Sequence, residues 1–207
     1  MTTTTRKRVS RLPLTMETKR PRTCEDVKLA ELLGKMRNSS SRDEAKQAGS
    51  ILKALLNTEE RIRKFVENEE NFDALVAIFI KHASNLKTDE HNCEILQYSI
   101  SILGNCCHVV PETGFSVKKL CRNFWELGVR ILENSSMDIK TSLCKLIANI
   151  CLNKELALSW ISSKTLTFDN IAALLDSEDM KLVRQCIRVF QVLANASLTR
   201  EKKLSRS

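Results

Sequence analysis

Apolar residues recur at three- and four-residue spacing along most of the chain, with polar residues between them. The clearest example is segment 139–153, whose apolar residues share one side of a helix. These residues are Ile139, Leu143, Leu146, Ile147, Ile150 and Cys151. Comparable segments continue from residue 25 to 197, and no strand-like alternation persists long enough to compete. The pattern predicts an all-α protein.

The periodic segments share an ending: two apolar residues, a small residue and Asn. It occurs at 146–149 and again at 102–105 and 192–195, with a weaker copy at 54–57. Successive copies are 48, 44 and 46 residues apart. Periods of about 40 to 47 residues are typical of all-helical solenoids, in which repeats stack side by side. The sequence therefore predicts about four stacked repeats.

The helices and domain boundaries follow from the same pattern and from its breaks. A serine run interrupts it near residue 40, where Ser41 followed by Glu44 fits a capping box. The expected helices are 25–38, 41–57, 61–66, 72–82, 93–110, 115–133, 139–153, 153–163, 168–176 and 180–196. We expect a repeat domain at 24–198 between a disordered basic arm, 1–23, and a basic C-terminal tail, 199–207.

The net charge of +8 lies on the two ends of the chain. Residues 1–22 carry a net charge of +6 and residues 200–207 carry +3, which leaves the body close to neutral. A nucleic-acid-binding solenoid is expected to carry basic residues on its folded surface. Contact with nucleic acid is therefore expected only through the basic arm.

The arm contains two basic clusters separated by a ten-residue spacer, which resembles a bipartite nuclear-localisation signal. The clusters are Arg6, Lys7 and Arg8, and Lys19, Arg20 and Arg22. Such a signal binds an acidic groove on an import carrier. Ser10 lies in a basic context that suits phosphorylation, and a phosphate there would offset part of the charge. The alternatives are a solubilising tail that binds anions nonspecifically and an unmodified serine.

Composition argues against a secreted or membrane-spanning chain. The N-terminus is polar and basic without an apolar central run, and no apolar stretch approaches the length of a membrane span. Several of the eight cysteines occupy core-type positions beside Leu and Ile, which favours reduced, buried thiols. We expect the protein in the nucleus, the cytoplasm or both.

We find no pattern that predicts catalysis, a cofactor or a metal site. Cys106 and Cys107 precede His108, but adjacent side chains on a helix point about 100° apart and no CxxC pair accompanies them. Glycine-rich phosphate loops, HExxH, GxSxG and paired carboxylates do not occur. Trp125 and Trp160 lie in periodic apolar segments and are expected in the core. We do not expect an enzyme.

The repeat unit resembles the armadillo family: a short helix, an apolar pair, a Ser, Asn or Asp turn, and a long helix ending in the Asn motif. Residues 168–195 carry the resemblance best, and 124–149 carry it well. Residues 72–105 match with an insertion, and 25–57 match only at their end. The resemblance implies a right-handed helical-repeat solenoid, with HEAT-like repeats as the nearest alternative.

In armadillo proteins, Asn side chains on the third helices bind the backbone of an extended peptide along a concave groove. The amide suits this task because it both donates and accepts hydrogen bonds. By position, the resemblance implies a ladder of four such residues: Asn57, Asn105, Asn149 and Asn195. The alternative is that these residues only end their helices.

One departure bears on the ligand. Importin-type armadillo proteins place Trp one turn before the Asn, whereas this chain has Lys53, Ser101, Lys145 and Gln191 there. Reception of nuclear-import cargo is therefore not expected. Lys53 and Lys145 on that face favour an acidic segment, as in the catenin-like branch.

We expect a non-enzymatic scaffold or adaptor that binds a segment of a partner protein on the concave face of the solenoid. One alternative is a chromatin- or nucleic-acid-associated subunit whose arm contacts phosphates. Another is a structural subunit whose apolar outer surface or end repeats are buried in a larger complex.

Overall fold

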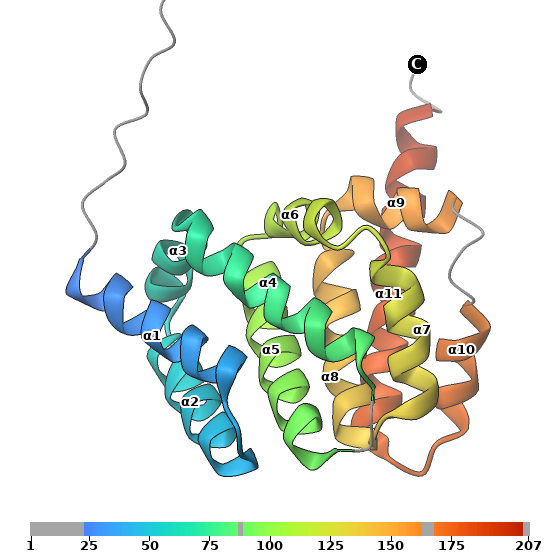
Figure 1. Cartoon of the computed structure of the whole chain (residues 1–207). Helices are drawn as coiled ribbons and strands as arrows, with labels where there is room; N and C mark the ends of the chain where they lie inside the picture. The colour runs from blue at the N-terminus through green and yellow to red at the C-terminus, as the bar shows by residue number, and fades with distance from the viewer. Residues whose placement is uncertain (1–22, 87–88, 163–167, 205–207) are drawn as a thin grey trace, which may run out of the picture.

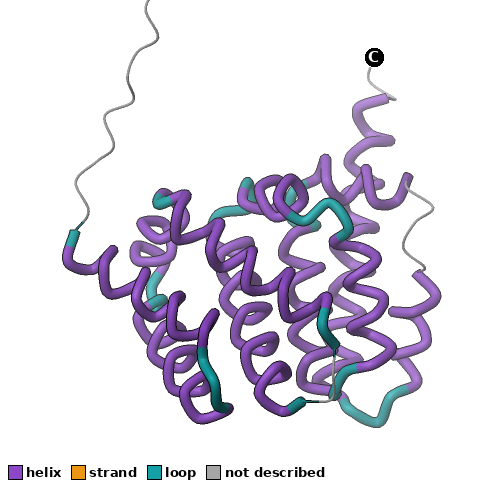
Figure 2. The backbone as a smooth tube through the Cα atoms, viewed as in Figure 1, coloured by secondary structure: helices purple, strands orange, loops and turns teal. Residues whose placement is uncertain are grey.

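The computed structural model describes residues 23–86, 89–162 and 168–204, and every regular element in these ranges is a helix (Figures 1 and 2). The helices are α1 (Cys24–Asn38), α2 (Arg42–Leu55), α3 (Glu59–Glu67), α4 (Glu69–Ser84), α5 (Glu90–Val109), α6 (Thr113–Leu120), α7 (Phe124–Asn134), α8 (Met137–Ile150), α9 (Lys154–Ser162), α10 (Phe168–Ala172), the 3₁₀ helix η1 (Ala173–Asp176) and α11 (Met180–Leu204). The all-α prediction is confirmed.

Polar residues at the helix starts bind backbone N–H groups that would otherwise lack partners. Thr23 and Asp26 form a complete capping box at α1. At α2, Ser41 accepts a hydrogen bond from the Glu44 N–H, as predicted. The other half of that box differs, because the Glu44 carboxylate accepts from the N–H of Ser40.

The helices fall into repeats of three. Short first helices (α3, α6 and α9) are followed by second helices (α4, α7, and α10 with η1) and by long third helices (α5, α8 and α11). In the described part of the first repeat, α1 and α2 take the second and third places. The third helices α2, α5, α8 and α11 pack in succession, with α1, α4 and α7 in front of them in Figure 1. This arrangement confirms a solenoid of about four repeats.

Apolar side chains from all repeats form one continuous core. Trp125 and Trp160 are both buried, and their rings stack with centroids 4.6 Å apart. This contact joins α7 of the third repeat to α9 of the fourth, as expected for core residues. Six of the eight cysteines are also buried.

Most predicted helix ends lie within three residues of those in the structure, and three predicted helices differ more. The expected helix 115–133 is two helices, because residues 121–123 form a turn between the first and second helices of the third repeat. Segment 168–176 changes from α-helix to 3₁₀-helix at Ala173. Helix α11 runs to Leu204, past the expected helix end at Ala196, since no Gly or Pro interrupts residues 197–204.

None of the helices that the structure describes is long and apolar enough to span a membrane. The basic clusters at Arg6–Arg8 and Lys19–Arg22 lie outside the described residues, and so does Ser10.

Candidate functional site

The four third helices present one row of polar side chains, which we call the third-helix face: Arg42, Lys53, Gln97, Asn105, Ser142, Lys145, Asn149 and Arg188. Hydrogen bonds along this face join every neighbouring pair of third helices. Between α2 and α5, Arg42 binds Glu90 Oε2 at 2.6 Å and Glu94 Oε2 at 3.3 Å. Between α5 and α8, Gln97 Nε2 donates to Ser142 Oγ at 2.9 Å.

Asn149 lies at the centre of the longest of these connections. It is fully buried, and its Nδ2 donates to the Gly104 carbonyl oxygen on α5 at 2.6 Å. Its Oδ1 accepts from Arg188 Nη2 on α11, also at 2.6 Å. The amide therefore links three successive third helices, and both of its polar atoms are engaged inside the protein.

A second amide holds a lysine in the same way. Lys145 Nζ on α8 donates to Asn105 Oδ1 on α5 at 3.2 Å. Both residues are half-buried. Two of the four predicted ladder residues therefore contact cations of this face directly.

Lys53 on α2 and Arg188 on α11 lie close enough to Lys145 on α8 for their positive charges to act on its ammonium group. Burial, and then the positive charges of Lys53 and Arg188, hold the pKa of Lys145 below its usual range. Among the described residues, none of the three forms an ion pair with a carboxylate. Like charges held together in this way oppose folding of the free protein and favour an anionic ligand.

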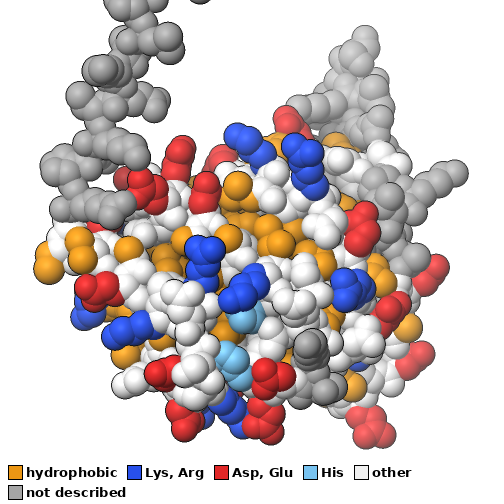
Figure 3. Space-filling view, in the orientation of Figure 1, with side chains coloured by type: hydrophobic (Ala, Val, Ile, Leu, Met, Phe, Trp, Pro, Cys, Tyr) orange, Lys and Arg blue, Asp and Glu red, His pale blue; other side chains and the backbone are white. Residues whose placement is uncertain are grey.

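The charge on the side formed by the second helices is arranged differently. Figure 3 views that side, and acidic and basic side chains are interspersed over it.

The other predicted ladder residues lie at the two ends of the row. Asn57 is exposed just after α2, and its Oδ1 accepts from Arg61 Nη1 at 3.4 Å. Asn195 is exposed on α11. The four Asn residues thus occupy successive third helices or their ends, but their environments differ from fully buried to exposed.

The alternative that these Asn residues only end their helices fits one position best. Helix α5 continues four residues past Asn105, and α11 continues nine residues past Asn195. Asn149 precedes the last residue of α8, and only Asn57 follows the end of its helix. Helix termination therefore does not account for the recurrence.

The sequence pattern missed Arg188 and Arg42. Arg188 precedes Asn195 by seven residues, so the two share one side of α11. The residue seven positions before the Asn is Arg188 on α11 and Ser142 on α8. A search of this position in each repeat would therefore have identified both residues.

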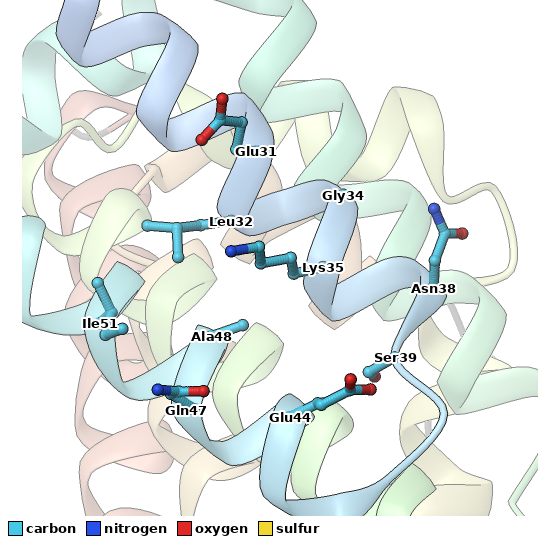
Figure 4. Close-up of a pocket in the computed structure, with 10 residues that line it drawn as sticks. All are labelled: Glu31, Leu32, Gly34, Lys35, Asn38, Ser39, Glu44, Gln47, Ala48 and Ile51. Carbon is cyan, nitrogen blue, oxygen red and sulfur yellow. The ribbon is translucent and has the colours of Figure 1, made fainter.

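A separate hollow of about 550 Å³ opens at the N-terminal end of the row of repeats. All its lining residues belong to α1, α2 and the turn between them. In Figure 4, Leu32 and Lys35 from α1 face Ala48 and Ile51 from α2. None of the four ladder Asn residues lines the hollow. It lies on the first repeat, whereas each later repeat packs against the repeat before it.

The cysteine-rich segment on α5 is not arranged as a reactive site. Cys106 and Cys107 are buried, whereas His108 is exposed. Burial raises the pKa of Cys107 to about 12, so its reactive thiolate form is disfavoured at neutral pH. Within the described residues, no three His, Cys, Asp or Glu side chains are grouped so that they could hold a metal ion.

No protein-family model matches the chain, and no curated protein matches its sequence. Its fold does match solved structures. A designed armadillo repeat protein in complex with the peptide (KR)4 has a TM-score of 0.60 at 18% identity, covering 81% of this chain and 70% of that one. An engineered protein from a structural genomics consortium has a TM-score of 0.63 at 17% identity, covering 80% of this chain.

A second engineered protein gives a TM-score of 0.60 at 16% identity and covers 80% of this chain. The chain spans 62% of the first engineered protein and 37% of the second. These likenesses show that the chain has an armadillo-like repeat fold.

Proposed function

We propose that this armadillo-like repeat protein is a non-enzymatic scaffold that holds an acidic segment of a partner protein on its third-helix face. The observation that carries the proposal is Lys145, which is half-buried, is held by Asn105 and lies within the electrostatic reach of Lys53 and Arg188. Among the described residues, none of these three cations is paired with a carboxylate. An acidic side chain placed between them would relieve their repulsion.

The Asn residues take two roles in this proposal. Asn57 and Asn195 are exposed at the ends of the row and can bind the backbone of an extended segment. Asn105 and Asn149 act through Lys145 and Arg188, whose positions they fix by hydrogen bonds. The segment is therefore held by its acidic side chains at the centre and by its backbone at the ends.

The designed armadillo repeat protein that shares this fold is in complex with a basic peptide, (KR)4. The cations on the third-helix face support the opposite preference in this chain. A fluorescently labelled peptide of alternating Asp and Glu is the acidic counterpart, and (KR)4 itself is the control.

Fluorescence anisotropy with both peptides tests the proposal. We expect the acidic peptide to bind and (KR)4 to bind at least about tenfold more weakly, since a tenfold ratio requires about 1.4 kcal/mol. Lys145→Glu should abolish the preference for the acidic peptide. Lys140→Glu is the matched control, because it lies on the same helix about 140° away from Lys145. Equal binding of both peptides, or an unchanged preference in Lys145→Glu, would contradict the proposal.

A separate proposal concerns localisation. The six basic residues of the two N-terminal clusters support recognition of the arm by an import carrier. Residues 1–22 fused to a fluorescent protein are then expected to accumulate in the nucleus. Replacement of Arg6, Lys7 and Arg8 by Ala should disperse the fusion, and an unaltered distribution would refute this role.

A further inference from the structure

Helix α11, the last helix described, carries a row of exposed apolar side chains. Met180, Ile187 and Leu198 are 68%, 45% and 55% exposed. Their spacings of seven and eleven residues place them on one side of the helix, and the exposed Ala194 lies on the same side. The exposed polar residues Arg184 and Gln191 lie on this side between them. We call Met180, Ile187, Ala194 and Leu198 the α11 stripe.

The α11 stripe points away from α8. Val189 is buried and lies about 200° around the helix from Ile187, on nearly the opposite side. The α8 side of α11 is marked by Cys186, whose sulfur lies 3.9 Å from that of Cys144 on α8. The stripe therefore faces outward along the direction in which the repeats stack.

Neighbouring third helices pack against each other at three interfaces in the molecule. Helix α5 packs between α2 and α8, and α8 packs between α5 and α11. Within the described residues, α11 has a third helix on one side only. Each repeat of a repeat protein buries its apolar surface against the adjacent repeats. The α11 stripe therefore resembles the surface on which a further helix would stack.

The charges beside the stripe distinguish between possible occupants. No Asp or Glu occurs between Met180 and Leu198, whereas Lys181 and Arg184 lie in that span and Arg188 of the third-helix face lies next to it. Two copies of α11 packed antiparallel about a two-fold axis would place their basic edges side by side. No carboxylate from this span would then separate the cations, so charge complementarity favours a partner with acidic groups at that edge.

We infer that the α11 stripe docks an amphipathic helix of a partner protein. The apolar side of the partner helix packs on Met180, Ile187 and Leu198, and its acidic residues lie against Lys181 and Arg184. A helix suits the site because it continues the row formed by α2, α5, α8 and α11. The stripe adjoins the third-helix face on α11, because Arg188 lies about 100° around the helix from Ile187. Separate substitutions on the two surfaces, Ile187→Asp and Lys145→Glu, therefore distinguish the two sites.

A designed pair of labelled helical peptides tests the inference by fluorescence anisotropy against the full chain. Both peptides have Leu at heptad positions a and d, and the flanking e and g positions are Glu in one and Lys in the other. We expect the Glu-flanked helix to bind at least about tenfold more tightly than the Lys-flanked helix. Ile187→Asp should weaken binding of the Glu-flanked helix by about tenfold or more, because it places a carboxylate within the apolar contact.

Val27→Asp provides a matched control. Val27 on α1 is also 45% exposed, but it lies on the first repeat, at the other end of the stack. Its replacement should leave binding unchanged, which also shows that the loss in Ile187→Asp is not a general effect of added negative charge.

Three results would overturn the inference. Equal binding of the two peptides would remove the argument from charge. Binding that is insensitive to Ile187→Asp but lost in Lys145→Glu would place the helix on the third-helix face. Self-association of the wild-type chain in light scattering, abolished by Ile187→Asp, would show that a second copy covers the stripe.

Discussion

Individual Asn residues in this protein share a motif but not an environment. Asn149 is buried between α5 and α11, whereas Asn57 is exposed after α2. The recurrence of Asn could be recognised in the sequence, since it occurs at nearly constant spacing. The contacts of Asn149 could not, because its partners Gly104 and Arg188 lie 45 and 39 residues away.

The difference predicts unequal effects of the same substitution. Asn149→Ala removes the donor to the Gly104 carbonyl oxygen and the acceptor of Arg188 Nη2, so both groups lose their partner. We expect the free energy of unfolding to fall by about 1–3 kcal/mol. Asn57→Ala should change it by less than about 0.5 kcal/mol. Urea denaturation followed by circular dichroism measures both, and equal effects would show that Asn149 has no structural role.

His82 predicts how stability depends on pH. Its Nδ1 lies 2.6 Å from Asn92 Oδ1, and within the described part of the chain its buried Nε2 has no hydrogen-bond partner. Burial lowers the pKa of His82 below 6.5, although the hydrogen bond to Asn92 opposes this shift. The unfolded chain therefore takes up a proton at higher pH than the folded chain does.

We accordingly expect the contribution of His82 to stability to be complete above about pH 6.5 and to decline as the pH falls below that value. Urea denaturation between pH 7 and 5 measures the slope. His82→Gln removes the titrating group and should flatten it, whatever its effect on stability at pH 7. An equally steep decline in the variant would assign the pH dependence to other groups.

At the scale of helices, close packing between repeats depends on small residues. A Cβ atom on Gly49 of α2 would lie 2.5 Å from Cγ and Cδ2 of Tyr98 on α5. These ring atoms are near the start of the side chain, so Tyr98 cannot avoid the clash by a small adjustment. Around Gly34 of α1, a Cβ atom would meet nothing within 4 Å.

The two glycines therefore predict effects of opposite sign. Gly49→Ala should destabilise the protein by about 1–3 kcal/mol, because α2 and α5 must move apart. Gly34→Ala should stabilise it by about 0.5–1 kcal/mol, because Ala is the better helix former. Thermal and urea unfolding of the two variants compare them directly. Stabilisation by Gly49→Ala would mean that α2 and α5 pack less closely than described.

The helices differed in how far they could be predicted. Long third helices such as α8 are marked by sustained apolar periodicity and were located to within a few residues. The division between α6 and α7 was not predicted, because Cys121 and Phe124 continue the apolar pattern across the turn. Arg122 and Asn123 in the turn are polar and exposed, but two polar positions within an apolar helical pattern do not by themselves indicate a break.

At the scale of the whole molecule, the repeat period was sufficient to predict the stacked architecture, and the fold matches designed and engineered proteins of known structure. The gathering of Lys53, Lys145 and Arg188 was predicted only in part. The two lysines precede Asn residues in the repeat motif, whereas Arg188 reaches this face through its contact with Asn149. Packing of successive repeats, rather than local pattern, brings the three cations together.

The central claim is that the third-helix face binds an acidic segment of a partner protein, and affinity purification from cells tests it most directly. The purification compares three proteins: the wild-type chain, Lys53→Glu/Lys145→Glu and the control Lys28→Glu/Lys140→Glu. Circular dichroism first establishes that all three are equally helical. We predict that the wild type and the control retain a protein partner through an acidic segment and that Lys53→Glu/Lys145→Glu loses it. Recovery of the same partners in equal amounts by all three proteins would contradict binding at the third-helix face.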